Sequence, residues 1–358
     1  MKIGIACHRF GHGGGMERYT LDVVDGLRRL GLRPVVFARA FDRDIEAYRD
    51  IDPVLIRVGA LPGKLRDHVF SHRLRAIKAE YGLDALIGCS RTEVSDLAIC
   101  GGTHLGHIAH RDKPAGFWDK RLIALEAAHY ANARYVVAHS ELMAAELRTL
   151  YAVPARRIVV LNPPVDERRF HPVDAASRLR LRHALELPDD RVVFLFASTG
   201  HERKGYPMLA ASFARSRLPV LLAVAGRPIE TPAPNVRYLG YRQDIENCYR
   251  AADYTILASR YEPFGLVGPE SVLCGTPALL AANIGCADTL SGRAGLRFDG
   301  NDPASLEAAV ERAVATVRRG EARLQDPRSH LSYNPEITAH VRALLDLAEA
   351  AAPLRQWS

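Results

Sequence analysis

The sequence predicts an α/β protein built from two doubly wound domains in tandem. Short β-branched runs alternate with stretches of helical periodicity along the whole chain, and parallel strands need such crossover helices. The alternation restarts after a proline-rich junction at 161–172, which can continue neither a helix nor a strand ladder. The chain has 358 residues, enough for two domains that each bury a core.

The first half contains six segments with strand character, which are 2–7, 34–38, 53–58, 83–88, 134–140 and 157–161. Helical periodicity between them is clearest at 16–30 and 118–132. These elements predict an N-terminal domain over 1–163.

The second half repeats the pattern with six further strand segments, which are 192–198, 220–226, 236–241, 254–259, 276–281 and 295–299. They predict a C-terminal domain over 164–335. The remaining residues, 336–358, carry a helical stretch that no strand follows, so this helix can pack back on the N-terminal domain.

Composition excludes several classes of protein. Hydrophobic residues make up 48% and charged residues 25%, which is typical of a folded globular chain. No apolar run approaches the ~20 residues that span a bilayer, and the first residues match a strand better than a signal peptide, so we expect a cytoplasmic protein. Six scattered cysteines without CxxC spacing favour neither disulfides nor a zinc site. Two Asp-x-Asp pairs, at 42–44 and 50–52, share one acid-rich stretch, and we expect no metal there.

The net charge of +7 is concentrated in the first half, where 1–165 has 24 Lys and Arg against 18 Asp and Glu. Two basic stretches stand out, 57–78 and 107–121, and the second also contains Phe117 and Trp118. An anionic lipid surface or macromolecule is the expected partner. The alternative is that these stretches reflect base composition rather than function, since arginine supplies 42 of the 48 basic residues. Basic clusters are otherwise not interleaved with stacking aromatics, so we expect no nucleic-acid partner.

A glycine-rich turn, GHGGGMERY at 11–19, follows the first strand and opens a helix. Backbone N–H groups at such a helix start favour a phosphate. The turn does not match the dinucleotide fingerprint, because Met16 or Arg18 stands where the third small residue belongs, and no acidic residue ends the second strand. A nicotinamide cofactor is therefore not expected, and a tight turn without a ligand is the alternative.

Glu262 and Glu270 flank a loop that follows a predicted strand and opens a helix. Gly265 permits close backbone approach, and the carboxyl end of a parallel strand is the usual place for a ligand. Glu270 can accept hydrogen bonds from two ribose hydroxyls, and Glu262 can hold sugar hydroxyls. The amides of Leu266 and Val267 would then face a diphosphate. Helix capping by both carboxylates is the alternative.

Arg203 and Lys204 stand together at another predicted helix start. Positive side chains there oppose the helix dipole, so a structural motive is lacking. They make sense if they neutralise a bound phosphate. A solvated surface pair is the alternative.

Taken together, these motifs resemble the retaining glycosyltransferases of family 4, whose GT-B fold has two Rossmann-like doubly wound domains facing each other across a cleft. The resemblance covers nearly the whole chain. Its ordered motifs are the Gly turn at 13–15, VDERRFHP at 165–172, RKG at 203–205, LGYRQDI at 239–245, and the glutamate pair with AGLRFD at 294–299. It implies an acceptor-side N-terminal domain and a C-terminal domain that binds a nucleotide sugar.

The resemblance gives each motif a role. Lys204 would stabilise the leaving diphosphate, Glu262 would grip the donor sugar, and Glu270 would bind the ribose. The remaining members of the implied nucleotide-sugar site are Gly14, Gly15, Arg169, Arg203, Tyr241, Arg242, Phe264, Gly265, Leu266 and Val267. In that site, Gly14 and Gly15 would approach the β-phosphate, while the backbone near Tyr241 and Arg242 would meet the base.

Two further positions follow from the resemblance. Many members carry Gly-Arg at the end of the first C-terminal strand, where this chain has Ala197 and Ser198, so Arg203 or Arg169 is expected to supply the second phosphate cation. His104, just after the strand-like LAIC, is expected beside the donor sugar and the acceptor hydroxyl, in preference to His107. A structural or merely exposed histidine is the alternative.

The chain is also similar to members that glucosylate the heptose of the lipopolysaccharide inner core, which touch the membrane through a basic, aromatic stretch where 104–121 stands here. The resemblance therefore implies retaining transfer of glucose from UDP-glucose to an anionic glycolipid, without a metal or cofactor, by a peripheral protein on the inner face of the cytoplasmic membrane. A GDP-sugar is the alternative donor. A UDP-sugar epimerase of the same architecture and a non-enzymatic basic membrane-binding protein remain open.

Overall fold

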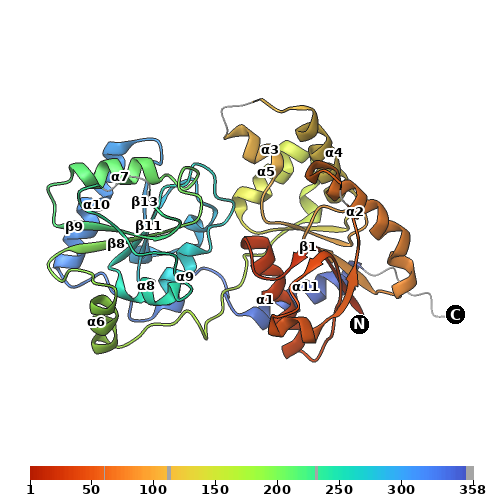
Figure 1. Cartoon of the computed structure of the whole chain (residues 1–358), viewed down its shortest axis with the longest axis horizontal. Helices are drawn as coiled ribbons and strands as arrows, with labels where there is room; N and C mark the ends of the chain where they lie inside the picture. Colours follow the sequence, from red (N-terminus) through yellow and green to blue (C-terminus); the bar gives the residue numbers. More distant parts are fainter. Residues whose placement is uncertain (60, 111–113, 230–232, 352–358) are drawn as a thin grey trace. The chain divides into compact units, whose positions relative to one another are not determined.

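The computed structural model describes residues 1–59, 61–110, 114–229 and 233–351 (Figure 1). Contacts divide the chain into two compact units. Unit 1 comprises Met1–Pro164 and Asn334–Ser358, and unit 2 comprises Val165–Tyr333. The boundaries expected from the sequence, 163/164 and 335/336, fall beside these divisions.

Unit 1 contains a seven-stranded parallel sheet in the order β3-β2-β1-β4-β5-β6-β7. Its strands are β1 (Ile3–Phe10), β2 (Val35–Phe41), β3 (Asp52–Leu55), β4 (Ala85–Gly88), β5 (Leu97–Cys100), β6 (Tyr135–Ala138) and β7 (Ile158–Val160). Six of them overlap the predicted segments, and β5 is the strand-like LAIC. The order reverses between β1 and β4, and sheets of this kind bind ligands beyond the carboxyl ends at such a point.

Helices cover both faces of this sheet. They are α1 (Gly15–Arg29), α2 (Gly63–Ile77), α3 (His104–Ala109), α4 (Phe117–Asn132), α5 (Glu141–Tyr151) and α11 (Ile337–Ala351), with 3-10 turns η1 (Glu46–Asp50), η2 (Lys78–Tyr81) and η3 (Ala155–Arg157). On one face, α11 packs on α1, and Gly26 allows this approach because a Cβ there would collide with the Val341 side chain. On the other face, α2 buries Phe70 and Leu74 against Phe37 of β2. Helix α11 therefore contributes to the core of unit 1, although it follows unit 2 in the sequence.

Unit 2 contains a six-stranded parallel sheet in the order β10-β9-β8-β11-β12-β13. The strands are β8 (Val192–Ser198), β9 (Val220–Gly226), β10 (Val236–Tyr238), β11 (Tyr254–Leu257), β12 (Ala278–Ala281) and β13 (Gly295–Phe298). The order reverses between β8 and β11. Both units are doubly wound parallel sheets, so the predicted α/β fold class is confirmed.

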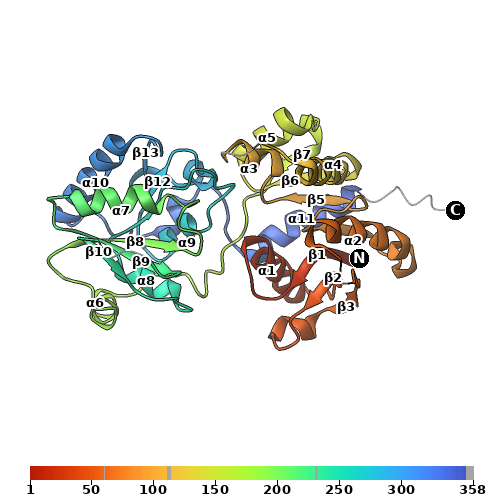
Figure 2. The same ribbon diagram turned by 45° about the horizontal axis from the view of Figure 1, so that its top comes forward.

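The helices of unit 2 are α6 (Ala175–Ala184), α7 (Tyr206–Arg215), α8 (Ile245–Ala251), α9 (Val267–Leu273) and α10 (Pro303–Arg318), with 3-10 turns η4 (Gly285–Thr289), η5 (Gly292–Ala294) and η6 (Pro327–His330). Helices α7 and α10 pack together on one face of the sheet, and α6 and α8 pack together on the other (Figure 2). Between these layers, β8 and β9 are buried along their full length. This central pair forms the core of the sheet next to the reversal point.

Three chemical features complete the description. All six cysteines are buried free thiols. Over the described ranges, no group of three or more His, Cys, Asp and Glu side chains is placed to hold a metal ion. Within the same ranges, every helix is too short or too polar to cross a bilayer.

Candidate functional site

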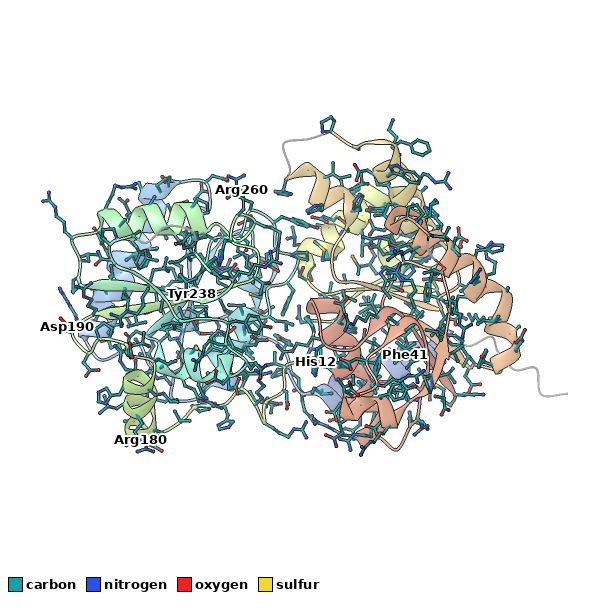
Figure 3. The ribbon with its side chains drawn as sticks, viewed as in Figure 1. His12, Phe41, Arg180, Asp190, Tyr238 and Arg260 are labelled. Carbon is teal, nitrogen blue, oxygen red and sulfur yellow. The ribbon has the colours of Figure 1, made fainter. Side chains whose placement is uncertain are left out.

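Two loops meet at the carboxyl edge of the unit 2 sheet, where the strand order reverses. Residues 199–205 leave β8 and residues 258–266 leave β11. The N–H of Arg260, an exposed residue labelled in Figure 3, donates a 3.2 Å hydrogen bond to the carbonyl of Arg203. Gly205 makes this contact possible, because its φ is +78° and a Cβ there would collide with the carbonyl of Ala258. The fold thus joins two predicted motifs that lie far apart in the sequence.

The premise that Arg203 lacks a structural role is wrong, because its side chain has two partners within unit 2. Its Nη1 lies 3.0 Å from Oε2 of Glu262 and 3.1 Å from the carbonyl of Tyr261. The Arg203 side chain is 45% exposed, whereas that of Glu262 is 16% exposed. A helix-dipole argument cannot detect this partner, because the ion pair forms between loops of two neighbouring strands.

Lys204 is half-buried beside this pair. Its Nζ donates to the carbonyl of Ala197, 3.1 Å away, at the end of β8. Burial lowers the pKa of Lys204, with Glu262 opposing the shift, Arg203 adding to it and Glu270 opposing it. These four predicted side chains therefore interact electrostatically. Among the described residues its hydrogen-bond partner is a neutral carbonyl, and a partly desolvated ammonium of this kind suits an incoming anion.

Glu270 is buried on α9, with 4% of its surface exposed. The hydroxyl of Tyr249 on α8 donates to its Oε2 over 2.9 Å. The preceding loop turns at Gly265, whose φ is +87°. The amides of Leu266 and Val267 donate to no acceptor within the described part of the chain. The loop end therefore presents two backbone donors next to a fixed carboxylate.

The other predicted residues of unit 2 have less direct placements. Phe264 is 5% exposed and its ring packs on Tyr333, so its side chain anchors the loop in the core. Tyr241 is 71% exposed. Arg242 lies 3.0 Å from Asp244, and Arg169 lies 2.8 Å from Glu246. Each of these two arginines is therefore already paired with a carboxylate.

In unit 1, the glycine turn joins β1 to α1, as predicted. Gly14 is the N-cap of α1 and Gly15 is its first residue. A Cβ at Gly15 would meet no atom within 4 Å, and one at Gly14 would lie 3.1 Å from the Glu17 carboxylate. Space is therefore open beside this helix start, while Glu17 complements the helix dipole.

His104 begins α3 and is held by two carboxylates of α4. Its Nε2 lies 2.9 Å from Oδ1 of Asp119, and its N–H donates to Oε2 of Glu126 over 2.7 Å. His107 lies one turn further on, with its ring centroid 6.3 Å from that of His104. Sequence reasoning missed Asp119 and Glu126, although their spacing of seven places both on one helix face.

The two basic stretches differ in structure. In 57–78, Arg75 pairs with Glu93, and Lys78 lies 2.9 Å from Asp96, so part of the charge is neutralised. In 107–121, Arg111 and Lys113 lie outside the described residues. The Phe117 and Trp118 rings meet edge to face at 5.2 Å and are 66% and 37% exposed. Lys120 and Arg121 follow them and are exposed.

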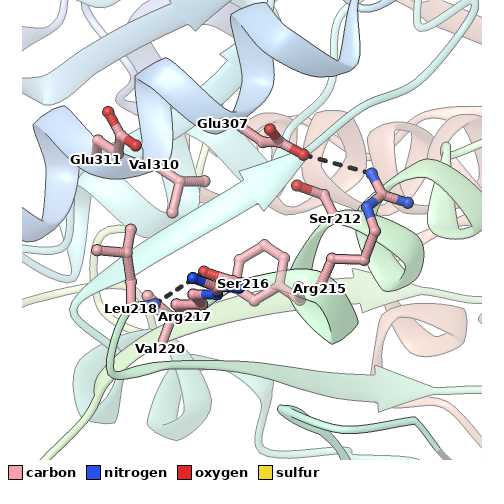
Figure 4. A pocket seen from close by; sticks show the side chains of 10 residues that line it. Ser212, Arg215, Ser216, Arg217, Leu218, Val220, Glu307, Val310 and Glu311 are labelled. Atoms are coloured by element: carbon pink, nitrogen blue, oxygen red, sulfur yellow. Dashed lines mark hydrogen bonds and ion pairs between the residues drawn. The ribbon is translucent and has the colours of Figure 1, made fainter.

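A surface cavity of about 320 Å³ lies between α7 and α10 (Figure 4). Its walls include Phe213, Val310 and the ion pair of Arg215 with Glu307, which are 3.3 Å apart. It lies at the C-terminal end of α7, roughly 15 Å along the helix from Lys204. The predicted residues do not line this cavity.

Comparisons with known families match both halves of the chain. Residues 13–169 match the family model described as Glycosyltransferase Family 4. Residues 191–316 match the model described as Glycosyl transferases group 1. The matched regions contain every predicted site residue.

Among proteins of known name, a probable transglycosylase of Burkholderia thailandensis is 50% identical, over 99% of both chains. A D-inositol 3-phosphate glycosyltransferase of Streptosporangium roseum is 28% identical, over 85% of this chain and 81% of its own.

Solved structures share the fold at low sequence identity. WaaG, a glycosyltransferase involved in lipopolysaccharide biosynthesis, is 16% identical with a TM-score of 0.74, over 99% of this chain and 100% of its own. Sucrose-phosphate synthase from Thermosynechococcus elongatus is 19% identical with a TM-score of 0.80, over 98% of both chains. Anabaena HepE in complex with UDP-glucose is 15% identical with a TM-score of 0.77, over 98% of this chain and 100% of its own.

Proposed function

Because the chain belongs to the family 4 glycosyltransferases, we propose that it transfers glucose from UDP-glucose to a membrane-associated glycolipid, with retention of configuration and without a metal ion. The observation that carries the proposal is the electrostatic cluster of Arg203, Lys204, Glu262 and Glu270 at the reversal point of the unit 2 sheet. The alternatives of helix capping and solvated surface charges explain neither its position nor the partial burial of Lys204.

The diphosphate is the part of the donor that this cluster suits best. The Lys204 ammonium has only a carbonyl partner among the described residues, so a phosphate would offset its desolvation. Arg203 is bound to Glu262 and would exchange this carboxylate for the second phosphate. These cations and the amides of Leu266 and Val267 would stabilise the leaving group as charge develops, which is the task a metal ion performs in other transferases.

The sugar and the ribose would each use one glutamate. Glu262 would accept hydrogen bonds from sugar hydroxyls once Arg203 has turned to the phosphate. Glu270, oriented by Tyr249, would accept from the ribose hydroxyls. The exposed Tyr241 and the half-buried Arg242 lie on the loop after β10, where their backbone would meet the base. UDP-glucose is proposed as the donor because the similar HepE structure holds that molecule.

The reaction would follow front-side displacement. The bond from the sugar C1 to the diphosphate oxygen breaks, the acceptor oxygen bonds to C1 from the same face, and the acceptor proton passes to the departing diphosphate oxygen. Atoms and charge balance without a further reactant. Exclusion of water from the site would favour transfer over hydrolysis.

The site is tested by thermal unfolding with UDP, GDP, UDP-glucose and GDP-mannose, each with magnesium and with EDTA. A ligand at 100 times its dissociation constant stabilises the native state by about 2.7 kcal/mol. We expect UDP and UDP-glucose to raise Tm equally with and without the metal, and Lys204→Ala and Glu270→Ala to abolish the rise. Lys120→Ala and Glu307→Ala are matched controls at exposed sites and should keep it. No shift with any nucleotide would sink the proposal, and isomerisation of the sugar without an acceptor would favour an epimerase.

The proposal for the acceptor is based on exposed side chains at the start of α4. Phe117 and Trp118 are exposed beside Lys120 and Arg121, a combination that binds anionic bilayers. We propose that this surface brings the enzyme to a lipid-anchored acceptor, the lipopolysaccharide core. Sedimentation with phosphatidylglycerol vesicles should capture the wild-type chain and lose most of it in Phe117→Ser/Trp118→Ser, with nucleotide affinity unchanged. Equal binding of both proteins would refute the membrane contact.

A further inference from the structure

His104 is held at two points by one face of α4. Asp119 contacts its ring and Glu126 accepts its backbone N–H, at 2.9 and 2.7 Å. The two acidic residues are seven apart, about two helical turns, so a single rigid element supplies both contacts. The ring and the backbone of His104 are therefore fixed together.

The backbone contact is part of a buried network. Glu126 is 1% exposed and also accepts from Nε of Arg91 at 2.8 Å and from the hydroxyl of Tyr151. Thr103 caps α3 by accepting from the amide of Gly106 at 3.0 Å, and its hydroxyl donates to Glu146. Helices α4 and α5 thus set the position of α3 before any ligand binds.

The ring contact decides which nitrogen carries the proton. Oδ2 of Asp119 accepts from the amide of Gly116 at 2.9 Å, while Oδ1 faces Nε2 of His104. A carboxylate only accepts hydrogen bonds, so Nε2 must be the protonated nitrogen. In the neutral ring, Nδ1 then keeps its lone pair, and it has no partner in the described chain.

We propose that Asp119 is a positioning residue that holds His104 in the Nε2–H tautomer, so that Nδ1 accepts a hydrogen bond from a sugar hydroxyl during transfer. The ligand class, a carbohydrate hydroxyl, rests on the proposed function. The tautomer rests on the contacts alone. Asp119 itself touches no substrate and acts only through the imidazole.

The tautomer is tested by long-range ¹H–¹⁵N NMR on the full chain at neutral pH, with His104→Gln identifying the resonance. The neutral form of the wild-type ring should be almost only the Nε2–H tautomer. In Asp119→Asn the amide has one accepting oxygen for two donors, so the Nε2–H share should fall by about half or more. Asp302→Asn is the matched control, because Asp302 caps α10 through a 2.9 Å bond to Ala304 and contacts no histidine. A dominant Nδ1–H form in the wild type, or no change in Asp119→Asn, would overturn the assignment.

The positioning role is tested by hydrolysis of UDP-glucose, with water as the acceptor. Asp119→Asn should lower kcat roughly tenfold, the rate equivalent of one hydrogen bond, with KM and UDP affinity unchanged. Asp119→Glu, which keeps a carboxylate, should recover part of the rate. An altered tautomer with unchanged kcat would refute the positioning role. Absence of nucleotide binding in the wild type, with the tautomer as predicted, would instead refute the proposed function.

Discussion

The hydroxyl of Tyr249 donates a hydrogen bond to Oε2 of Glu270 over 2.9 Å, and both side chains are almost completely buried. The contact joins α8 to α9, which follow β10 and β11, two strands that β9 and β8 separate in the sheet. It fixes one oxygen of the carboxylate that we assign to the ribose. The orientation of Glu270 thus depends on a residue 21 positions away.

Replacing Tyr249 by Phe removes this donor and keeps the ring. We expect the free energy of unfolding to fall by about 1–3 kcal/mol, because a buried carboxylate loses a partner. The affinity for UDP should fall roughly tenfold, since Glu270 is no longer oriented. Inorganic diphosphate has no ribose and serves as the control ligand in calorimetry. Equal losses for both ligands would contradict the ribose role of Glu270.

Gly205→Ala should destabilise unit 2 more than Gly320→Ala. Both glycines have positive φ, +78° and +72°, so each alanine bears a strain of about 1 kcal/mol. At Gly320 the new Cβ meets nothing within 4 Å, whereas at Gly205 it collides with the Ala258 carbonyl, which adds roughly 1–3 kcal/mol. Urea denaturation measures the difference. Equal urea midpoints for the two variants would show that the loops 199–205 and 258–266 can move apart without loss of stability.

Gly15→Ala separates ligand approach from folding. The added Cβ meets no atom within 4 Å, so stability should stay constant or rise by about 0.4–1 kcal/mol. If the helix start approaches a phosphate, turnover of UDP-glucose should fall by about tenfold or more. Stability and turnover measured on the same preparation provide the test. Unchanged turnover would return the glycine turn to a purely structural role.

The affinity for UDP should fall at alkaline pH. Burial lowers the pKa of Lys204 from 10.5, and only the charged form attracts a diphosphate. As pH rises through this lowered pKa, Lys204 becomes neutral and binding weakens. Below it the charge is complete and affinity is independent of this group. Calorimetry from pH 7 to 10 should show an alkaline loss in the wild type that is smaller in Lys204→Met. Parallel profiles would exclude Lys204 as the titrating group.

Unit 1 should lose stability as pH falls below 6.5. Burial lowers the pKa of His8, His129 and His340 to about 4 and that of His139 to about 3. Below pH 6.5, the ordinary pKa of histidine, these side chains are protonated in the unfolded chain but stay neutral in the folded chain. Each histidine then reduces the free energy of unfolding by up to about 1.4 kcal/mol per pH unit, down to its folded pKa.

Urea titrations between pH 7 and 5 measure this slope before most carboxylates titrate. His139→Phe keeps a ring beside Tyr19, whose centroid is 4.5 Å away, and should reduce the slope by about one proton. His183→Gln is the control, because that side chain is 61% exposed. A slope unchanged in His139→Phe would show that this histidine is protonated in the folded protein.

The fold was predictable because its central strands are buried on both faces and therefore form continuous apolar runs. The predicted segments 192–198 and 220–226 coincide with β8 and β9. Segment 236–241 ends early as β10, and Gly240 then turns the chain with a φ of +83°. Such strand ends depend on tertiary contacts that periodicity does not report.

The arrangement of the candidate site was predictable where it follows from position along the chain. Lys204 and Glu262 lie on loops that follow strand ends, and Glu270 lies on the helix after the second loop, so the sheet topology brings them together. The partners of Glu270 and His104 were not predictable. Tyr249 and Asp119 lie on helices, and nothing in their local sequence distinguishes a contact residue from a solvated one. Arg203 and Glu262 were each expected to bind the donor, yet in the structure they bind each other.

Helix α11 belongs to unit 1 but follows unit 2 in the sequence, and this order constrains biosynthesis. Val341 and Leu344 cover apolar residues of α1 and the sheet. The ribosome delivers them only after all of unit 2 has been made. Unit 2 can fold as soon as it emerges from the ribosome. Until α11 has been made, the nascent unit 1 exposes an apolar face to which chaperones can bind. Completion of unit 1 is therefore a late step of translation.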